Sequence, residues 1–598
     1  MAAEREGAAH DSARQDSAER HLFELAAGRW TAREPLTVAL RQAEDYESPG
    51  LPTLRADTAY YRSRLPGESN FCLRRAQIDR ERGRFVGVRV LIDPGIWHPT
   101  GTAVLNGFSV SPDGARVVTE LARDGSETGE LVVIDTDTGE HSPVPALRVR
   151  YAAVRWLPDS SGFRCAGRLG NAKEQTVLCH VSALGIVARA EPDVEPVSMP
   201  AKAIVDVAGG TRAAASVRMG DRVLSLHTED GASVLTVRPE LRTVGALAAP
   251  RRLHLGLDAL MHVERFSAYT VAASPTSADP ADDRHEAWIV ASDPGTPPRL
   301  YRHDVGTGRT QAFGEESAAD STEIVHQRLV ATMSDGAEVD LIVSARRHDL
   351  TRDGHPRAPS PLILTCYGGF GVSSGSAYEA SLPAWTNQGG VFVTAQIRGG
   401  GEQGPAWHAA GSGASKLRCV TDLVECAEML QRTGWCSPGS LCLMGASHGG
   451  LVVLAAALRR PGLCAAVAAT APLLDMTVFH REGFGARWLA EFGDPDDAAD
   501  RERLLAYSPR HLLDALPPNT PLPAVLCSVF QADERVPPVR ARAFVRDLRM
   551  RGGRAWLRTE AAAGHGAKPL DQVRRFSADL LGFAAAHTAA CTPPEEER

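Results

Sequence analysis

The sequence predicts two domains: an all-β domain in the first half of the chain and a doubly wound α/β domain with a mostly parallel sheet in the second half. The chain has 598 residues, too many for a single hydrophobic core. Short apolar runs separated by turn signals fill residues 54–323. From residue 324 onward, buried strands alternate with helices, an order typical of a parallel sheet covered on both faces. Residues 1–53 fit neither pattern, and we expect them to pack on the α/β domain.

The strands expected in the first domain are short and evenly spaced. Val104–Val110, Val117–Glu120 and Leu131–Asp135 are apolar runs; the turn sequence S-P-D-G follows the first and T-D-T-G follows the third. Strands at this spacing indicate a sandwich, a barrel or a propeller. A four-stranded propeller blade needs roughly 40 residues, so the segment has room for about seven blades.

The second domain is expected to contain buried strands, each followed by a helix. The apolar runs that predict strands are Leu362–Thr365, Val391–Ile397, Leu441–Met444 and Pro523–Phe530. The segments that predict helices are Asp422–Arg432, Gly450–Arg459, Val539–Arg549 and Leu570–Ala586.

Composition and charge exclude several classes of protein. The net charge of −8 and pI near 6.2 argue against a nucleic-acid-binding protein, which is usually basic. The first twenty residues lack the apolar core of a signal peptide, and no run reaches the roughly 18 apolar residues that span a bilayer. The eleven cysteines show no regular spacing and are best interpreted as reduced thiols. We therefore expect a cytoplasmic protein without membrane or nucleic-acid partners.

The stretch Gly445-Ala446-Ser447-His448-Gly449 carries the strongest chemical signal. A buried strand precedes it and an apolar helix follows, which is the setting of the G-x-S-x-G nucleophile turn. Small neighbours are needed because the serine backbone is strained and the strand and helix pass closely. Ser447 is the expected nucleophile, and the amide of His448 would lie near the reacting carbonyl at the helix N-terminus.

A serine nucleophile needs a base and an orienting acid, in the chain order Ser, Asp or Glu, then His. Asp533 follows the expected strand Pro523–Phe530 and is the preferred acid, with Glu534 as its neighbouring competitor. His565 lies on a loop before the last helix and is the preferred base; His587, near the tail, is a poor rival.

Several motifs in order resemble the prolyl oligopeptidase family, an α/β-hydrolase domain capped by a β-propeller. Cys366–Phe370 resembles the family's Y-G-G-F, and Ile397–Glu402 resembles I-R-G-G-G-E. Gly445–Gly450 resembles G-G-S-N-G-G, Asp533–Val536 resembles D-D-R-V, and Gly564–Pro569 resembles G-H-G-A-G-K-P with one residue missing. The likeness covers residues 325–586 and, more weakly, the opening of the all-β domain. A seven-bladed propeller is therefore the expected form of that domain.

The resemblance also implies roles for residues outside the triad. Tyr367 matches the tyrosine that forms the oxyanion hole together with the amide of His448. Arg535 matches the arginine that holds a substrate carbonyl, although it could instead pair with Asp533 or Glu534. Trp488 matches the tryptophan that stacks on a proline ring at P1, the substrate residue before the scissile bond. The residues at the positions that line that pocket are Phe370, Leu473, Phe492 and Val536. None of these five is acidic, which disfavours a pocket for Arg or Lys.

The chain departs from the family pattern at two places. His448 stands where asparagine often follows the nucleophile, and the family's N-terminal D-P-Y-R-W-L-E segment has no visible counterpart. The all-β domain is also short for a family propeller, so these departures bear on domain packing and on the route by which substrate enters.

The sequence thus predicts a serine endopeptidase that cleaves short peptides after proline, with the propeller limiting access. It implies a peptide substrate and no metal or organic cofactor, and a monomer is favoured. The alternatives are a related oligopeptidase or esterase with another P1 preference, a peptide-maturing protease or macrocyclase, and a propeller-based binding protein with an inactive hydrolase domain.

Overall fold

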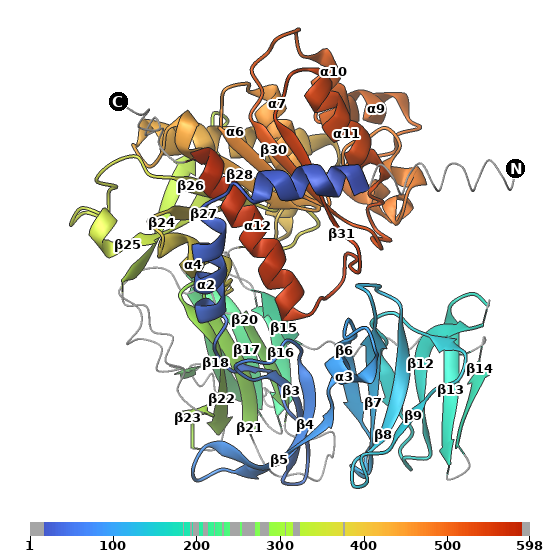
Figure 1. Cartoon of the computed structure of the whole chain (residues 1–598). Helices are drawn as coiled ribbons and strands as arrows, with labels where there is room; N and C mark the ends of the chain where they lie inside the picture. Colours follow the sequence, from blue (N-terminus) through green and yellow to red (C-terminus); the bar gives the residue numbers. More distant parts are fainter. Residues whose placement is uncertain are drawn as a thin grey trace, which may run out of the picture.

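A computed structural model gives the structure of the chain. It describes residues 17–588 except 171, 183–184, 192–193, 195–202, 207–212, 220–221, 230–231, 240–250, 254–269, 276–285, 305–306, 315–322 and 375–376. Figure 1 shows the β-sheets of the first half of the chain below an α/β domain formed by the second half. The second half forms a mixed, mostly parallel sheet and the first half forms separate antiparallel sheets, as the sequence predicted.

The α/β domain is built on one eight-stranded sheet in the order β24-β25-β27-β26-β28-β29-β30-β31. Its strands are β24 (Ile324–Thr332), β25 (Glu338–Arg346), β26 (Leu362–Cys366), β27 (Val391–Ala395), β28 (Leu441–Ala446), β29 (Ala466–Thr470), β30 (Ala524–Phe530) and β31 (Ala555–Glu560). β24, β25 and β27 pair antiparallel, and every pairing from β27 to β31 is parallel. The four strands that the sequence predicted are all present, within two residues at either end.

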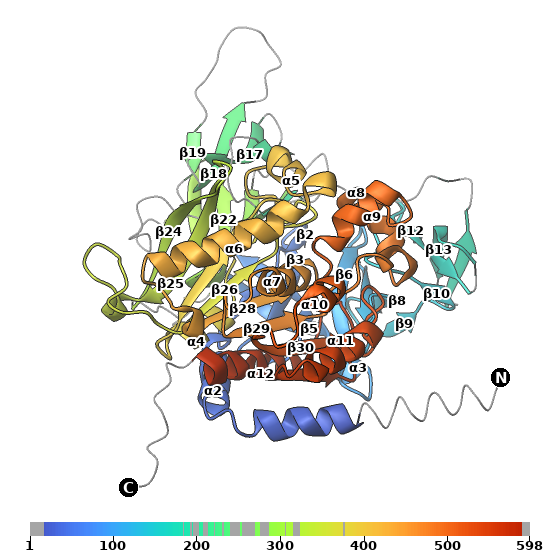
Figure 2. The same cartoon turned by 90° about the horizontal axis from the view of Figure 1, so that it is seen from above.

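Helices cover both faces of this sheet, as Figure 2 shows from above. The described helices of this domain are α4 (Ser381–Thr386), α5 (Pro405–Ala409), α6 (Leu417–Arg432), α7 (His448–Arg459), α8 (Leu489–Phe492), α9 (Ala498–Leu505), α10 (Pro509–Ala515), α11 (Val539–Met550) and α12 (Leu570–Thr588). Short 3-10 turns are η2 (Arg347–Asp349), η3 (Gly413–Ser415), η4 (Pro438–Ser440), η5 (Phe479–Arg481) and η6 (Gly485–Trp488). None of the described helices combines the length and apolarity that a membrane span requires.

Alternation along the strands divides the core into two layers. Leu362 and Leu364 of β26 pack in the layer that contains α6, α7, α10 and α11, whereas Ile363 between them packs in the layer that contains α12 and α4. Successive side chains of a strand point to opposite faces, so a strand that is apolar throughout needs helices on both sides.

The N-terminal segment packs on the outer helix of this second layer. Residues 17–27 are helical, and they lie with α2 (Arg33–Ala43) beside α12 in both views. The ring of Trp30 meets that of Phe583 edge to face at 5.6 Å. Arg33 Nε lies 2.6 Å from a carboxylate oxygen of Asp579. The segment is therefore tied to the α/β domain by both apolar and ionic contacts.

The first half of the chain forms antiparallel sheets of four or five strands. One sheet holds β1 (Ser48–Pro49), β2 (Thr53–Arg55), β3 (Thr58–Arg64), β4 (Cys72–Asp79) and β5 (Arg84–Ile92), and the next holds β6 (Val104–Val110), β7 (Arg116–Ala122), β8 (Gly129–Asp135) and β9 (His141–Pro143), with the short helix α3 (Pro94–Trp97) between them. A third holds β10 (Leu147–Arg148), β11 (Val154–Trp156), β12 (Gly162–Leu169), β13 (Gln175–Ser182) and β14 (Gly185–Ala190). The others hold β16 (Ala213–Met219), β17 (Arg222–Glu229), β18 (Ala232–Pro239) and β19 (Arg251–Leu253), and β15 (Ala203–Asp206) with β20 (Thr270–Pro275), β21 (Glu286–Asp293), β22 (Thr296–Asp304) and β23 (Arg309–Phe313).

These described strands make up five sheets, against the seven blades that the sequence predicted. Part of the segment in which further strands would lie, including 240–250, 254–269 and 276–285, is outside the described residues, so the blade number stays a prediction.

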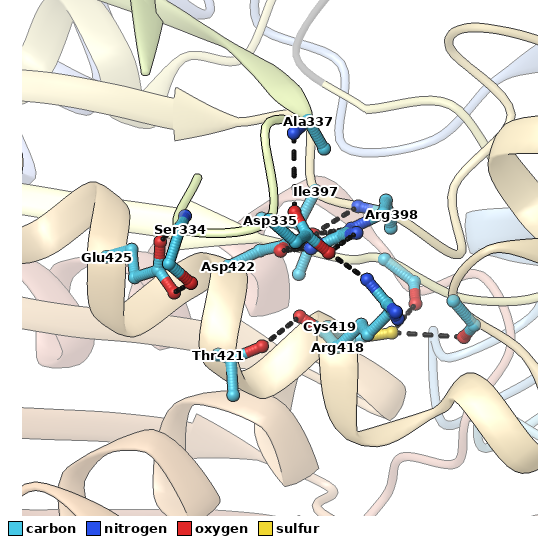
Figure 3. Close-up of polar contacts among 12 residues, drawn as sticks. Ser334, Asp335, Ala337, Ile397, Arg398, Arg418, Cys419, Thr421, Asp422 and Glu425 are labelled. Atoms are coloured by element: carbon cyan, nitrogen blue, oxygen red, sulfur yellow. Dashed lines mark hydrogen bonds and ion pairs between the residues drawn. The ribbon is translucent and has the colours of Figure 1, made fainter. Parts of the chain in front are cut away.

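A buried charge network anchors the loop after β27 to helix α6 (Figure 3). Arg398 Nε donates to Asp422 Oδ2 at 2.9 Å, and Arg398 Nη1 donates to Asp335 Oδ2 at 2.6 Å. The Arg398 and Asp422 side chains are only 6% and 1% exposed. Gly399, the next residue in this loop, accepts a hydrogen bond from the amide of Gly371. The network therefore supports the loop that follows β26.

Replacing Asp422 should destabilise the fold. Asp422→Ala leaves the Arg398 guanidinium buried without its main partner, and breaking a buried pair in this way costs roughly 3–5 kcal/mol. Glu428→Ala, on the same helix but in an exposed pair with Arg460, should cost less than about 1 kcal/mol. Denaturant unfolding of both variants measures the difference; equal losses would contradict a structural role for the network.

Candidate active site

Ser447 lies on a strained turn between strand β28 and helix α7. Its φ of 54° and ψ of −118° fall in a region that side-chain-bearing residues rarely adopt. A Cβ on Gly445 would lie 2.4 Å from the Gly449 carbonyl oxygen, and one on Gly449 would lie 2.4 Å from the Cys366 carbonyl oxygen. Strand and helix therefore pass too closely for any side chain at these two positions, which explains the G-x-S-x-G pattern.

The structure brings His565 and Asp533 together. His565 Nδ1 lies 2.8 Å from Asp533 Oδ2, and the Asp533 side chain is 1% exposed. The other carboxylate oxygen, Oδ1, accepts hydrogen bonds from the amides of Arg535 and Val536, both at 2.9 Å. Because the carboxylate accepts, Nδ1 carries the proton and Nε2 of His565 is left with a lone pair for a base.

The rival residues occupy other surroundings. Glu534 is exposed and accepts a hydrogen bond from Ser126 of the first domain at 3.4 Å. His587 packs in α12 against Trp556 and Phe583. Among the described contacts, none joins His565 Nε2 to the Ser447 hydroxyl; such bonds are often loose until substrate binds.

Tyr367 follows β26 and reaches the nucleophile. Its hydroxyl lies near the Ser447 side chain, and burial raises the pKa of the phenol, an effect that Ser447 partly offsets. The amide of His448 belongs to the first turn of α7, where N–H groups have no acceptor within the helix. Two donors therefore flank Ser447 from different elements, which is the arrangement needed to stabilise an oxyanion.

Arg535 pairs with the first domain rather than with Asp533 or Glu534. Its Nε donates to Glu127 Oε2 at 2.9 Å, and this bond raises the pKa of the guanidinium. Glu127 also binds Arg150 Nη2 at 2.9 Å and the Tyr151 hydroxyl at 3.0 Å. Sequence reasoning missed Glu127, because it lies 408 positions before Arg535 in a short turn between β7 and β8.

The same turn packs on the loop that carries His565. A Cβ on Gly125 would lie 2.0 Å from the amide nitrogen of Gly564. Farther along this loop, Lys568 Nζ donates to the Gly566 carbonyl at 3.0 Å and lies 3.9 Å from the centre of the Phe530 ring. Burial lowers the pKa of Lys568 to about 8. The histidine loop is thus held from both domains.

A small, half-open hollow lies beside Arg535. Its lining includes Trp488, Leu473 and Val536, three of the expected P1-pocket residues. Phe370 and Phe492 do not line it. The Phe370 ring packs edge-on against Trp488 at 6.0 Å, and the buried Phe492 ring meets Phe370 at 5.7 Å. These two rings support the pocket from behind.

Two carboxylates also line this hollow, which the sequence did not predict. Asp475 and Glu482 both face it. Arg540 pairs with both, through Nη1 to Asp475 at 3.5 Å and through Nη2 to Glu482 at 2.6 Å. Acidic residues therefore do line this hollow, contrary to the expectation from the sequence, and the single positive charge of Arg540 offsets only one of the two negative charges.

A second unpredicted group lies under the loop of residues 367–371, which we call the tyrosine loop. The buried Glu491 carboxylate accepts the Phe370 amide at 2.9 Å, His408 Nε2 at 2.8 Å and Lys416 Nζ at 2.5 Å. These partners are 75 or more positions away in the sequence, and their residue types carry no distinctive pattern.

Fold and geometry together define a serine hydrolase with an α/β-hydrolase core. The family model described as "Prolyl oligopeptidase family" matches residues 376–591, and the model of that family's N-terminal β-propeller domain matches residues 17–164. The chain belongs to the prolyl oligopeptidase family of serine peptidases.

Relatives and solved structures agree with this assignment. The prolyl endopeptidase of Elizabethkingia miricola is 24% identical over 572 residues, 83% of this chain and 80% of that protein. The prolyl endopeptidase of Elizabethkingia meningoseptica is 32% identical over 295 residues, 48% of this chain and 41% of that protein. A structure from a study of two prolyl endopeptidases matches with a TM-score of 0.79 and 25% identity, covering 96% of this chain and 94% of that one. Prolyl oligopeptidase B from Galerina marginata has the same fold, with a TM-score of 0.77 at 17% identity over 96% of this chain and 93% of that one.

Asp533→Asn should lower kcat for a nitrophenyl ester by about 10⁴-fold, because an amide facing Nδ1 favours the wrong imidazole tautomer. Glu534→Gln, the neighbouring carboxylate outside the site, is the matched control and should change kcat by less than about twofold. Steady-state kinetics test both variants. Equal losses of kcat in the two variants, or a larger loss in Glu534→Gln, would contradict the assignment of Asp533 as the triad acid.

Proposed function

We propose that this protein is a serine endopeptidase that cleaves short peptides on the carboxyl side of proline. The observation that carries the proposal is the hollow beside Arg535, whose walls include Trp488, Leu473 and Val536. A flat indole between aliphatic walls suits a rigid apolar ring. The matched relatives named prolyl endopeptidases support the same specificity.

In the proposed reaction, Ser447 attacks the scissile carbonyl while His565 Nε2 accepts the hydroxyl proton. Asp533 holds the imidazole in the required tautomer and stabilises its charged form. Tyr367 and the His448 amide donate to the developing oxyanion. His565 then protonates the leaving amine. Water repeats the sequence on the acyl-enzyme and releases the carboxylic acid product.

Arg535 contributes to substrate binding in this proposal. Glu127 occupies its Nε and Nη2, which leaves Nη1 to donate to a backbone carbonyl of the substrate. The Glu127 turn belongs to the propeller, so a substrate that reaches Arg535 contacts the interface between the domains. This position supports a role of the propeller in limiting substrate size.

We also propose a cytoplasmic location, supported by the thiols. The ten cysteines among the described residues are unpaired and buried, and burial raises the pKa of Cys436, Cys464 and Cys527 to about 12. Buried thiols of this kind are inert and fit a reducing compartment.

P1 profiling tests the specificity directly. Peptides that differ only in proline, alanine or arginine at P1 should be cleaved with kcat/KM about 10²-fold higher for proline than for alanine. Peptides of increasing length test the propeller gate, and mass spectrometry of the products separates hydrolysis from cyclisation. Lack of a preference for proline would contradict the proposal.

Covalent labelling tests whether Ser447 is the nucleophile. A fluorophosphonate probe should label the wild-type protein and fail to label Ser447→Ala. An unlabelled wild type would favour a propeller-based binding protein with an inactive hydrolase domain.

Removing Arg540 should alter the P1 preference. In Arg540→Gln the two carboxylates lose the one positive charge that they share, so kcat/KM for arginine at P1 should rise about tenfold, the equivalent of one charge-assisted hydrogen bond. Arg546→Gln is the matched control, since Arg546 lies on the same helix but pairs with Asp547 at 3.0 Å. An unchanged ratio of arginine to proline cleavage would show that Asp475 and Glu482 do not face the P1 side chain.

A further inference from the structure

The side chain of His448 joins the nucleophile turn to the tyrosine loop. His448 is fully buried, and its Nδ1 lies 2.6 Å from the carbonyl oxygen of Tyr367. A carbonyl can only accept, so Nδ1 carries the proton and donates it. This contact occurs at the position where the chain departs from the family's G-G-S-N-G-G motif.

The imidazole is held in one orientation by its surroundings. It stacks on the Phe492 ring at 5.8 Å with an interplanar angle of 22°, and the rings of Tyr367 and Phe370 meet it edge-on at 5.7 Å and 6.1 Å. A Cβ on Gly369 would lie 2.8 Å from its Cγ and Nδ1. The ring therefore lies directly on the backbone of the tyrosine loop.

The same surroundings exclude acid–base chemistry by this histidine. Burial, together with the nearby Lys416 ammonium, holds the pKa of His448 well below its usual range. Its Nε2 is buried and has no hydrogen-bond partner in the described part of the chain. The ring is thus a neutral donor that makes one directed hydrogen bond.

We infer that the His448 side chain is a positioning residue for the oxyanion hole. The backbone amide of His448 is one of the two proposed donors, and its ring fixes the backbone of Tyr367, which supplies the other. One residue thereby sets the relative placement of both donors. The inference rests on the proposed function, because it concerns the same site.

Residues of the tyrosine loop are held by different neighbours, and the first residue, Tyr367, is held by His448. Gly368 is held by Cys419, whose Sγ lies 3.2 Å from the Gly368 carbonyl, and Phe370 is held by Glu491. The Tyr367 carbonyl is held by His448. Loss of the His448 donor should therefore shift Tyr367 without releasing the rest of the loop.

Two amide substitutions separate the donor from the volume of the ring. Asn places its amide nitrogen two bonds from Cβ, as Nδ1 of histidine is, whereas Gln places it one bond farther. His448→Gln should lower kcat for a nitrophenyl ester about 10²-fold, the effect of a misplaced oxyanion donor, with KM changed less than about twofold. His448→Asn should recover at least about tenfold of that loss.

A double-mutant cycle with Tyr367→Phe measures whether the His448 ring and the Tyr367 hydroxyl act together on kcat. If the ring acts through the Tyr367 hydroxyl, His448→Gln should cost less than about threefold in the Tyr367→Phe background. The inference would be overturned if the fold-loss in kcat of the double variant equalled the product of the two single losses. Equal activity of the Asn and Gln variants would also overturn it. Thermal unfolding of each variant identifies any loss that comes from a damaged fold. The Asn variant leaves the larger cavity, so a higher activity of Asn than of Gln cannot come from better packing.

Ester hydrolysis keeps this test separate from the question of specificity. A wild-type protein that hydrolyses the ester without preferring proline peptides would contradict the proposed function alone. A cycle without coupling would contradict the role of His448 alone.

Discussion

The close passage of strand β28 and helix α7 at Ser447 is the constraint on which the rest of the site depends. The turn holds a serine at φ 54°, and it does so only because Gly445 and Gly449 allow backbone to touch backbone. Strain of this kind persists where the surrounding structure holds it in place. Here the parallel strands β26, β28 and β29 and the apolar helix α7 supply that support, and their carboxyl ends bring Tyr367 and Ser447 to the same edge of the sheet.

Contacts between the two domains lie at the same edge of the α/β sheet. The turn between β7 and β8 supplies Glu127 to Arg535 and packs Gly125 on the loop of His565. Arg535 and His565 are therefore both held in part by a domain that supplies none of the three triad residues. This arrangement connects the propeller physically to the residues around the triad.

The sequence predicted the parts of the site that lie within short motifs. Ser447, Asp533 and His565 each follow a strand, and strand ends are recognisable from apolar runs and glycines. Residues that act through long-range contacts were missed. Glu127, Glu491 and Asp475 are ordinary carboxylates until folding places them against Arg535, the tyrosine loop and the hollow beside Arg535.

The strands of the α/β domain also differ in how well the sequence predicted them. The buried strands rich in branched residues were predicted closely, whereas β29, with the sequence A-V-A-A-T, was not, because alanine has little strand propensity. The antiparallel strands β24 and β25 were also missed, and their alternating polar residues differ from the buried runs next to them.

The central claim is that Ser447, Tyr367, the His448 amide and the Trp488 pocket act on one peptide carbonyl after proline. The most direct measurement is a crystal structure of the protein with a peptide aldehyde that ends in a proline residue. The account predicts a hemiacetal on Ser447 Oγ, its oxygen about 2.7–3.1 Å from both the Tyr367 hydroxyl and the His448 amide, and the pyrrolidine ring against Trp488. An adduct whose oxygen contacts neither donor, or whose ring lies outside this pocket, would contradict it.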